Sequence, residues 1–447
     1  MTTTTPSSSS RSLSRQILGL AVPAFGALIA EPLFLLADTA MIGRLGAPEL
    51  AGVGLAAAVV QTVTGLLIFL AYSTTPAVAR FLGAGQLDNA LARGRDGIWL
   101  GLGLGVVIGV IGWFAAPTLG QIATDDAAPH AIDYLQYSMI GLPGMLAVLA
   151  ATGVLRGLQD ATTPLIVAGG GFGLNIVGNY VLIYVLELGV VGSALGTSVI
   201  QWLMLAVYAL ILIPRMRRHN VGFAPTRHGL RATAQVGSWL LVRSASLRVA
   251  VLATVLTATA LGTEVLAAHQ IVFNVYSTMA FALDALAIAA QALIGKELGA
   301  SNVTTVRALT STMIRWSFGF GAITGMLLGI SAPWLPHLFT TDQAVIEATT
   351  AGLIVLAVSQ PLSGYVFVLD GILMGAGDAK YLGLIGIANI IVYLPALYGL
   401  AQLAANSTHM SAVAWVWIGF AGVYLAARAV GLWLRIRRDT WIRLGAH

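Results

Sequence analysis

The chain has 447 residues, of which 57% are apolar and only 9% are charged. Soluble domains carry about 25% charged residues, because their surfaces must be hydrated. The composition therefore excludes a soluble enzyme or binding module and predicts an integral membrane protein. The formal net charge is +5, but the basic residues lie at the ends of apolar segments, so we expect a lipid bilayer and no nucleic acid as partner.

Twelve apolar segments are long enough to cross a membrane. A bilayer core is ~30 Å thick and needs about 20 apolar residues per helix, because every backbone N–H and C=O must be satisfied within the helix. The sequence therefore predicts an all-α polytopic protein with twelve transmembrane helices. The segments are residues 17–40, 50–79, 97–117, 134–155, 164–186, 190–213, 235–260, 264–294, 313–335, 345–369, 381–404 and 411–434.

The amino-terminal residues 1–14 are polar and rich in Ser and Thr. They lack the apolar region of a signal peptide, so we expect a disordered cytoplasmic tail. With this end in the cytoplasm, nearly all Arg and Lys residues between segments fall on the inner side, which predicts that both termini are cytoplasmic. Arg greatly outnumbers Lys, and Ala and Gly are abundant, which favours a GC-rich bacterium and its inner membrane.

The second half of the chain repeats short motifs of the first half at a nearly constant offset. Because each copy holds six helices, both keep one orientation, which predicts two lobes related by a pseudo-twofold axis along the membrane normal. We expect the lobes at residues 15–213 and 232–447, joined by a cytoplasmic linker at 214–231. A cavity between such lobes is typical of transporters. The matches are Leu45-Gly46 with Leu261-Gly262, Leu82-Gly83-Ala84 with Leu298-Gly299-Ala300, offset by 216, and Gly157 to Asp160 with Gly375 to Asp378, offset by 218.

Several longer motifs, from the first apolar segment to the end of the tenth, resemble one transporter family. They are Pro23-Ala24, Glu31-Pro32-Leu33, Ala37 to Gly46, Arg156 to Asp160, Leu266 to Gln270, Ala282 to Ala285, and Leu369 to Asp378. The sequence resembles the multidrug and toxic compound extrusion (MATE) family, in its DNA-damage-inducible (DinF) branch. The resemblance implies a cation-coupled antiporter, without a cofactor, that exports amphipathic or cationic organic compounds by alternating access. We expect it to act as a monomer.

Asp38 is the first candidate for coupling. An ionisable group inside a membrane helix is costly and is kept mainly for ion or proton transfer. The structural alternative is an Asp at a helix end that pairs with Arg44, but a spacing of six residues does not place the two on one helical face. The resemblance implies that Asp38 is the cation-coupling carboxylate.

Asn175 and Asn179 are spaced i, i+4, so both amides project from one helical face toward a polar partner such as Asp38. The resemblance implies that Thr197 belongs to the same site. The resemblance also implies that many relatives carry Asp where Asn179 stands, and an amide cannot hold a proton or a negative charge near neutral pH. We therefore expect H+ as the coupling ion, with Na+ as the alternative. The Asn pair could also serve only to join helices.

Other polar residues in the apolar segments have weaker assignments. Pro23 removes a backbone hydrogen bond, which predicts either a static kink or, as the resemblance implies, a hinge. Glu31 lies seven residues before Asp38, on the same face. We expect the remaining charges to form structural ion pairs rather than a substrate pathway, because isolated buried charges are penalised. These residues are Arg243, Arg248, Asp284 and Asp370.

Two alternatives remain open. A lipid-linked saccharide flippase of the wider superfamily would need several cationic residues for a pyrophosphate, and only Arg243 and Arg248 are candidates. An intramembrane transferase would need an Asp-rich motif, and the sequence has none. The seven His residues follow no metal-binding spacing, cysteine is absent, and no Gly-x-Ser-x-Gly motif occurs, so we expect neither a metal site nor an enzyme.

Overall fold

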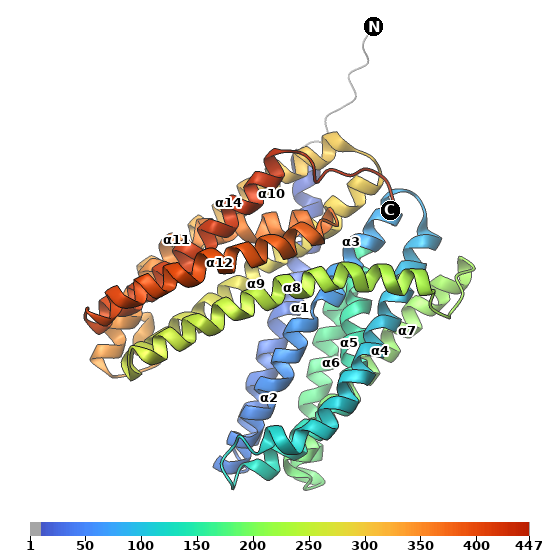
Figure 1. Cartoon of the computed structure of the whole chain (residues 1–447). Helices are drawn as coiled ribbons and strands as arrows, with labels where there is room; N and C mark the ends of the chain where they lie inside the picture. Colours follow the sequence, from blue (N-terminus) through green and yellow to red (C-terminus); the bar gives the residue numbers. More distant parts are fainter. Residues whose placement is uncertain (1–9, 447) are drawn as a thin grey trace. The chain divides into compact units, whose positions relative to one another are not determined.

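The computed structural model describes residues 10–446, and side chains from residue 13 onward. Every regular element in this part of the chain is a helix (Figure 1). Twelve helical segments are long and apolar enough to cross a membrane, which confirms the all-α, twelve-span prediction. Residues 1–9 of the predicted tail lie outside the described residues, whereas residues 10–14 already belong to the first helix.

The first six spans lie in the amino-terminal half of the chain. One of them is two helices joined end to end, and another ends in a π-helix. The elements are α1 (Ser10–Ile42), α2 (Ala47–Leu67) with α3 (Phe69–Gly83), α4 (Leu87–Gly120), α5 (Ala128–Gly157), α6 (Thr162–Tyr180) with the π-helix η1 (Val181–Val185), and α7 (Gly189–Arg218).

The other six spans follow without a soluble insertion. The last is interrupted by a π-helix. The elements are α8 (Arg227–Ala260), α9 (Thr263–Gly299), α10 (Val303–Ser331), the 3-10 helix η2 (Leu335–Leu338), α11 (Gln343–Gly375), α12 (Ala379–Ala405), and α13 (His409–Trp417) with the π-helix η3 (Ile418–Tyr424) and α14 (Leu425–Arg437).

The helices are longer than the apolar segments that predicted them. Helix α4 begins at Leu87, ten residues before the predicted start at residue 97. The added turns carry Asp88, Arg93, Arg95 and Asp96, which a hydropathy criterion rejects. Backbone hydrogen bonds continue a helix beyond the apolar region as long as polar side chains can be solvated or paired there.

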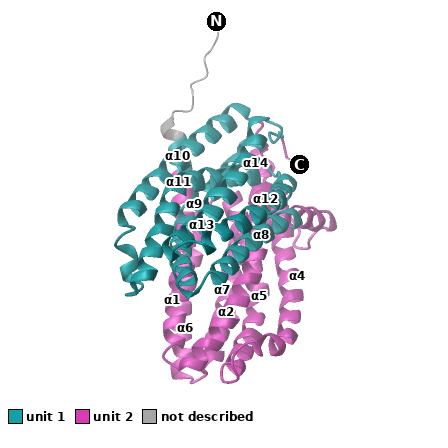
Figure 2. Cartoon of the chain, turned by 60° about the vertical axis from the view of Figure 1, so that its left-hand side comes forward, with its two compact units in different colours: residues 1–17, 238–298, 302–444 teal, residues 18–237, 299–301, 445–447 magenta. Residues whose placement is uncertain are grey.

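The chain divides into two compact units, coloured separately in Figure 2. Among the described residues, the amino-terminal unit contains 18–237, with 299–301 and 445–446, and the carboxyl-terminal unit contains 10–17, 238–298 and 302–444. The boundary inside α8 lies after Gly237, and not in the predicted linker at 214–231.

Each unit is built around one central helix. In the amino-terminal unit α5 packs against α2, α3, α4 and α7, and in the carboxyl-terminal unit α11 packs against α10, α13 and α14. Glycines allow the closest approaches, because their missing side chains let two backbones meet. Gly101 of α4 lies against the backbone of Leu146 in α5, and Gly364 of α11 lies against Ser317 in α10.

The sequence repeat is also visible in the backbone of the turns. After α5, three consecutive N–H groups donate back to the last turn of the helix: 158 to the carbonyl of 154, 159 to that of 156, and 160 to that of 155. After α11, residues 376, 377 and 378 repeat this pattern 218 positions later. The middle residue has a positive φ in both turns, 66° at Gln159 and 72° at Gly377. The shared turn geometry explains why the short motif at these positions recurs.

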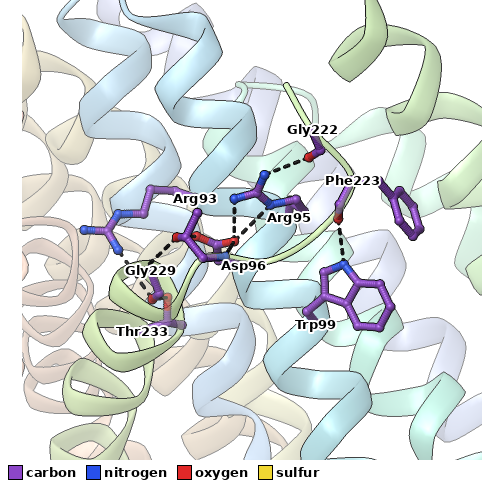
Figure 3. Close-up of polar contacts among 9 residues, drawn as sticks. Arg93, Arg95, Asp96, Trp99, Gly222, Phe223, Gly229 and Thr233 are labelled. Atoms are coloured by element: carbon purple, nitrogen blue, oxygen red, sulfur yellow. Dashed lines mark hydrogen bonds and ion pairs between the residues drawn. The ribbon is translucent and has the colours of Figure 1, made fainter. Parts of the chain in front are cut away.

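The segment between α7 and α8 is fixed to α4 (Figure 3). Only residues 219–226 are non-helical, so the predicted linker is helical at both ends. The buried Asp96 carboxylate accepts hydrogen bonds from the Thr226 N–H at 3.0 Å and the Thr226 hydroxyl at 2.8 Å, and it pairs with Arg95 at 2.7 Å. The Thr226 hydroxyl in turn accepts the N–H of Gly229, which caps the first turn of α8.

Two further contacts hold the same segment. Arg95 donates to the carbonyl oxygen of Gly222 at 2.7 Å, and the Trp99 indole donates to the carbonyl oxygen of Phe223 at 3.0 Å. The rings of Trp99 and Phe223 meet edge to face, with centroids 5.6 Å apart. The segment is therefore an ordered part of the amino-terminal unit (Figure 3).

Candidate functional site

Asp38 lies near the carboxyl-terminal end of α1 and is buried, with 4% of the residue exposed. Its Oδ1 atom accepts two hydrogen bonds, from the Asn179 amide at 2.9 Å and from the Ser193 hydroxyl at 2.6 Å. Both donors are neutral, so no ion pair formed by the described residues offsets the carboxylate charge. Arg44, the partner in the structural alternative, forms none of these contacts.

Asn175 and Asn179 are fully buried on one face of α6. The Asn175 amide donates to the Thr197 hydroxyl of α7 at 3.3 Å, while Asn179 reaches Asp38. The structure thus brings together the four residues singled out in the sequence, on the helices α1, α6 and α7. The Oδ1 atoms of both asparagines accept no hydrogen bond from the described residues.

Ser193 was missed by the sequence analysis. It is fully buried and lies four residues before Thr197, so both hydroxyls project from the same face of α7. That spacing repeats the Asn175–Asn179 pattern and could have identified it. Ser193 donates directly to Asp38, whereas Thr197 contacts Asn175, so Ser193 lies closer to the carboxylate in the hydrogen-bond network.

The site is surrounded by apolar packing and by an irregular helix. Ile42, Tyr134 and Ile183 belong to a buried cluster in the same part of the amino-terminal unit. The π-helix η1 begins two residues after Asn179, and its Tyr184 hydroxyl donates to the carbonyl oxygen of Met41 at 2.6 Å. Single-turn π-helices occur often at functional sites, because they redirect the side chains around them.

The site offers only oxygen atoms to a cation. Among the described residues, no group of three or more His, Asp or Glu side chains could hold a metal ion. Asp38, Asn175, Asn179 and Thr197 present one carboxylate, two amide oxygens and one hydroxyl. This donor set can exchange a proton at Asp38, and it could offer neutral oxygen ligands to Na+.

The other residues predicted on α1 do not join this network. Glu31 is exposed, two turns before Asp38, and makes no hydrogen bond or ion pair with it. Pro23 lies inside α1 as expected, but Pro32 does too, only six residues before Asp38. Pro32 therefore interrupts the backbone hydrogen bonds of α1 closer to the carboxylate than Pro23 does.

The carboxyl-terminal unit contains a second buried carboxylate, Asp370 of α11. Arg243 pairs with its Oδ2 atom at 2.6 Å, as the ion-pair expectation proposed, and Arg428 of α14 pairs with Oδ1 at 2.6 Å. Arg428 was missed, because a single Arg in the last apolar segment gives no sign of its partner. Arg248 is exposed and forms no ion pair with these residues, and Asp284 is half-buried.

Comparison with known proteins identifies the family. The MatE family model matches twice, at residues 23–181 and 241–399, so the two matches begin 218 residues apart, like the turns described above. Together they cover well over half of the chain.

The chain is also similar to known relatives along almost its whole length. It is 29% identical to Protein DETOXIFICATION 44, chloroplastic, of Arabidopsis thaliana, covering 95% of this chain and 83% of that protein. It is 28% identical to the multidrug resistance protein MdtK of Edwardsiella ictaluri, covering 96% of this chain and 97% of that protein.

A solved structure shows the same fold. The Vibrio cholerae MATE transporter VcmN, in its bent form, superposes with a TM-score of 0.86 over 98% of this chain and 98% of that one, at 20% identity. The fold class and the multi-pass membrane assignment are therefore confirmed, and a transporter rather than an enzyme is established by the family. The chain belongs to the MatE family of membrane transporters.

Proposed function

We propose that the chain is a proton-coupled antiporter of the DinF branch, which exports amphipathic or cationic organic compounds by alternating access. The names of relatives such as the multidrug resistance protein MdtK support the substrate class. The observation that carries the coupling is the buried Asp38 carboxylate, whose contacts are with neutral donors only. We place the protein in the inner membrane of a bacterium, as a monomer with both termini in the cytoplasm.

Protonation of Asp38 must rearrange the hydrogen bonds that join three helices. The ionised carboxylate accepts from Asn179 and Ser193, whereas a protonated carboxyl group gains a donor of its own. That new donor can bond to an amide oxygen of Asn175 or Asn179, neither of which has a donor among the described residues in this state. A single proton thereby changes which groups of α1, α6 and α7 are bonded to one another.

Coupling requires that this rearrangement and substrate binding favour different states. A ligand shifts a two-state equilibrium only by its different affinity for the two states, and the effect of two ligands on each other is reciprocal. Proton uptake at Asp38 should therefore favour the state that binds the exported compound weakly. Pro32, and further along α1 Pro23, are candidate positions at which the helix changes its bend.

Sodium coupling is the second candidate, and the amide oxygens of Asn175 and Asn179 favour it, because neither accepts a hydrogen bond from the described residues. Against it stands the charge of the site. Asp38 supplies one negative charge, and Asn179 adds none. Removing the hydration shell of an ion at membrane depth is costly, and neutral dipoles compensate it less well than a second carboxylate would. We therefore assign the coupling to H+.

Transport in proteoliposomes with separately imposed gradients tests the proposal. A pH gradient should drive efflux of a cationic dye in sodium-free buffer, and a sodium gradient alone should not. Asp38→Asn preserves the size and hydrogen bonding of the side chain but cannot titrate, so it should abolish efflux while the protein remains folded and inserted. Transport that requires sodium and ignores the pH gradient would reject proton coupling.

A further inference from the structure

A groove lies between α10 and α11 on the surface of the carboxyl-terminal unit. Its volume is about 670 Å³, and Arg315, Phe318 and Gly319 of α10 face Pro361, Leu362 and Tyr365 of α11 across it. This size lies within the ~300–1,000 Å³ range of small-molecule sites. The groove is separate from both buried carboxylates, and the transport mechanism does not use it.

The exposed face of α10 changes from polar to apolar at Arg315. Before it, the exposed positions are polar, namely Thr304, Arg307, Ser311 and Arg315 itself. After it they are apolar: Phe318 is 52% exposed, Ile323 61% and Met326 66%. Because lipid tails accept only apolar surface, this change marks the level at which the hydrocarbon of the bilayer begins. Arg315 therefore lies at the level of the lipid phosphates.

Helix α11 presents Tyr365 at the same level. The two helices are antiparallel, since Ser317 donates to the carbonyl oxygen of Gly364 and Gly325 lies against Ala357. This register places Arg315 and Tyr365 together at one end of the groove, with Phe318, Pro361 and Leu362 further along it. Tyr and Trp side chains favour membrane interfaces, and Trp316 adjoins Arg315 in the chain.

The Arg315 guanidinium has no acidic partner among the described residues. Its one hydrogen bond to the described residues is a 3.3 Å contact from Nε to the carbonyl oxygen of Ser311, which turns the side chain toward the polar end of α10. An exposed arginine at a membrane interface gains most from a phosphate, which accepts several of its N–H groups at once.

We propose that this groove binds a membrane phospholipid with an anionic headgroup. Its phosphate is held by Arg315 and the Tyr365 hydroxyl, and one acyl chain runs along Phe318, Pro361 and Leu362. The charge at one end and the apolar surface beyond it match the two parts of such a lipid. By the orientation proposed above, the lipid belongs to the cytoplasmic leaflet, but its binding does not depend on the coupling mechanism.

Native mass spectrometry of the full-length protein in mild detergent tests this binding. Phosphatidylglycerol and phosphatidylcholine with identical acyl chains are titrated as probes. We expect tighter binding of phosphatidylglycerol, because the choline cation of phosphatidylcholine offsets the charge of its phosphate. The affinity for phosphatidylglycerol should fall about tenfold in Arg315→Gln, because charge-assisted hydrogen bonds to phosphate are lost. Arg307→Gln is the control for loss of charge: Arg307 lies on the same exposed face, two turns outside the groove, and its guanidinium already pairs with Asp439 at 2.8 Å.

A second variant fills the groove rather than removing its charge. A Cβ atom on Gly319 would meet no atom within 4 Å, so a side chain can leave this position, and Gly319→Leu adds a branched apolar group at the lining of the groove. It should weaken binding of both lipids, and its unfolding temperature should remain that of the wild type. Equal binding of both lipids by the wild type would overturn the proposal. So would an equal loss of phosphatidylglycerol affinity in Arg315→Gln and Arg307→Gln.

Discussion

Asp38 and Asp370 are buried to the same extent, with 4% of each residue exposed, but their partners differ in charge. Asp38 accepts from an amide and a hydroxyl, whereas Asp370 is held by two guanidinium groups. A proton that bound Asp370 would have to displace both arginines, while one that bound Asp38 would only rearrange neutral hydrogen bonds. Burial alone therefore does not identify a coupling carboxylate, because the partners decide whether its charge can change.

The largest expected effect concerns stability at Asp370. Asp370→Asn removes the charge that pairs with Arg243 and Arg428, and breaking a buried ion pair from one side costs ~3–5 kcal/mol. Thermal unfolding in detergent should show a large decrease in the unfolding temperature of this variant. Asp38→Asn is the control and should unfold close to the wild-type temperature. Similar unfolding temperatures for the two variants would remove the distinction between the carboxylates.

Ser193→Ala tests whether the neutral donors tune Asp38. The variant removes the 2.6 Å hydrogen bond but no charge, and a hydrogen bond to a charged group contributes ~1.5–3 kcal/mol. We expect about tenfold slower efflux and a shifted pH profile of transport. Ser198→Ala, also buried on α7 but bonded to the Tyr137 carbonyl, should leave the pH profile unchanged. An unshifted profile for Ser193→Ala would argue against a tuning role.

Asn179→Asp sharpens the comparison by giving the Asp38 site a second charge. Two neighbouring carboxylates disfavour joint ionisation unless a cation lies between them. The efflux rate of this variant should therefore depend on external sodium. We expect a several-fold change in rate, which corresponds to about one hydrogen-bond energy. Efflux assays with and without sodium measure the change. If the efflux rate of the variant is the same with and without sodium, the missing charge at position 179 does not determine the choice of coupling ion.

The smallest expected effect compares the same turn in both halves. Gln159 has a φ of 66° where its counterpart Gly377 has 72°, and only glycine adopts such angles without strain. Gln159→Gly should therefore raise stability by up to ~1 kcal/mol, and Gly377→Ala should lower it by a similar amount. Thermal unfolding of both variants measures this. Destabilisation by Gln159→Gly would mean that the side-chain contacts of Gln159 outweigh the backbone strain.

The sequence predicted the helical class, the twelve spans and the repeat, because apolar length and spacing are properties of single segments. It also selected Asp38 and the Asn175–Asn179 face from helical spacing and family resemblance. It missed Ser193, although the spacing to Thr197 places both hydroxyls on one helical face. It could not predict Arg428, since nothing in one sequence states which helix packs beside α11. The early start of α4 was not predicted for another reason. Its charged turns are stabilised by contacts such as that of Asp96 with Thr226, which lie 130 residues apart in the sequence.

The role of Asp38 as the exchanging group is tested most directly by proton release from the purified protein. A compound that the wild type exports is added to the protein in weakly buffered, sodium-free detergent solution, and the pH is followed. If substrate and proton bind to opposing states, wild type should release up to about one proton per compound bound. Asp38→Asn should bind the compound and release none. Equal proton release by both proteins would contradict the assignment and place the exchanging group elsewhere.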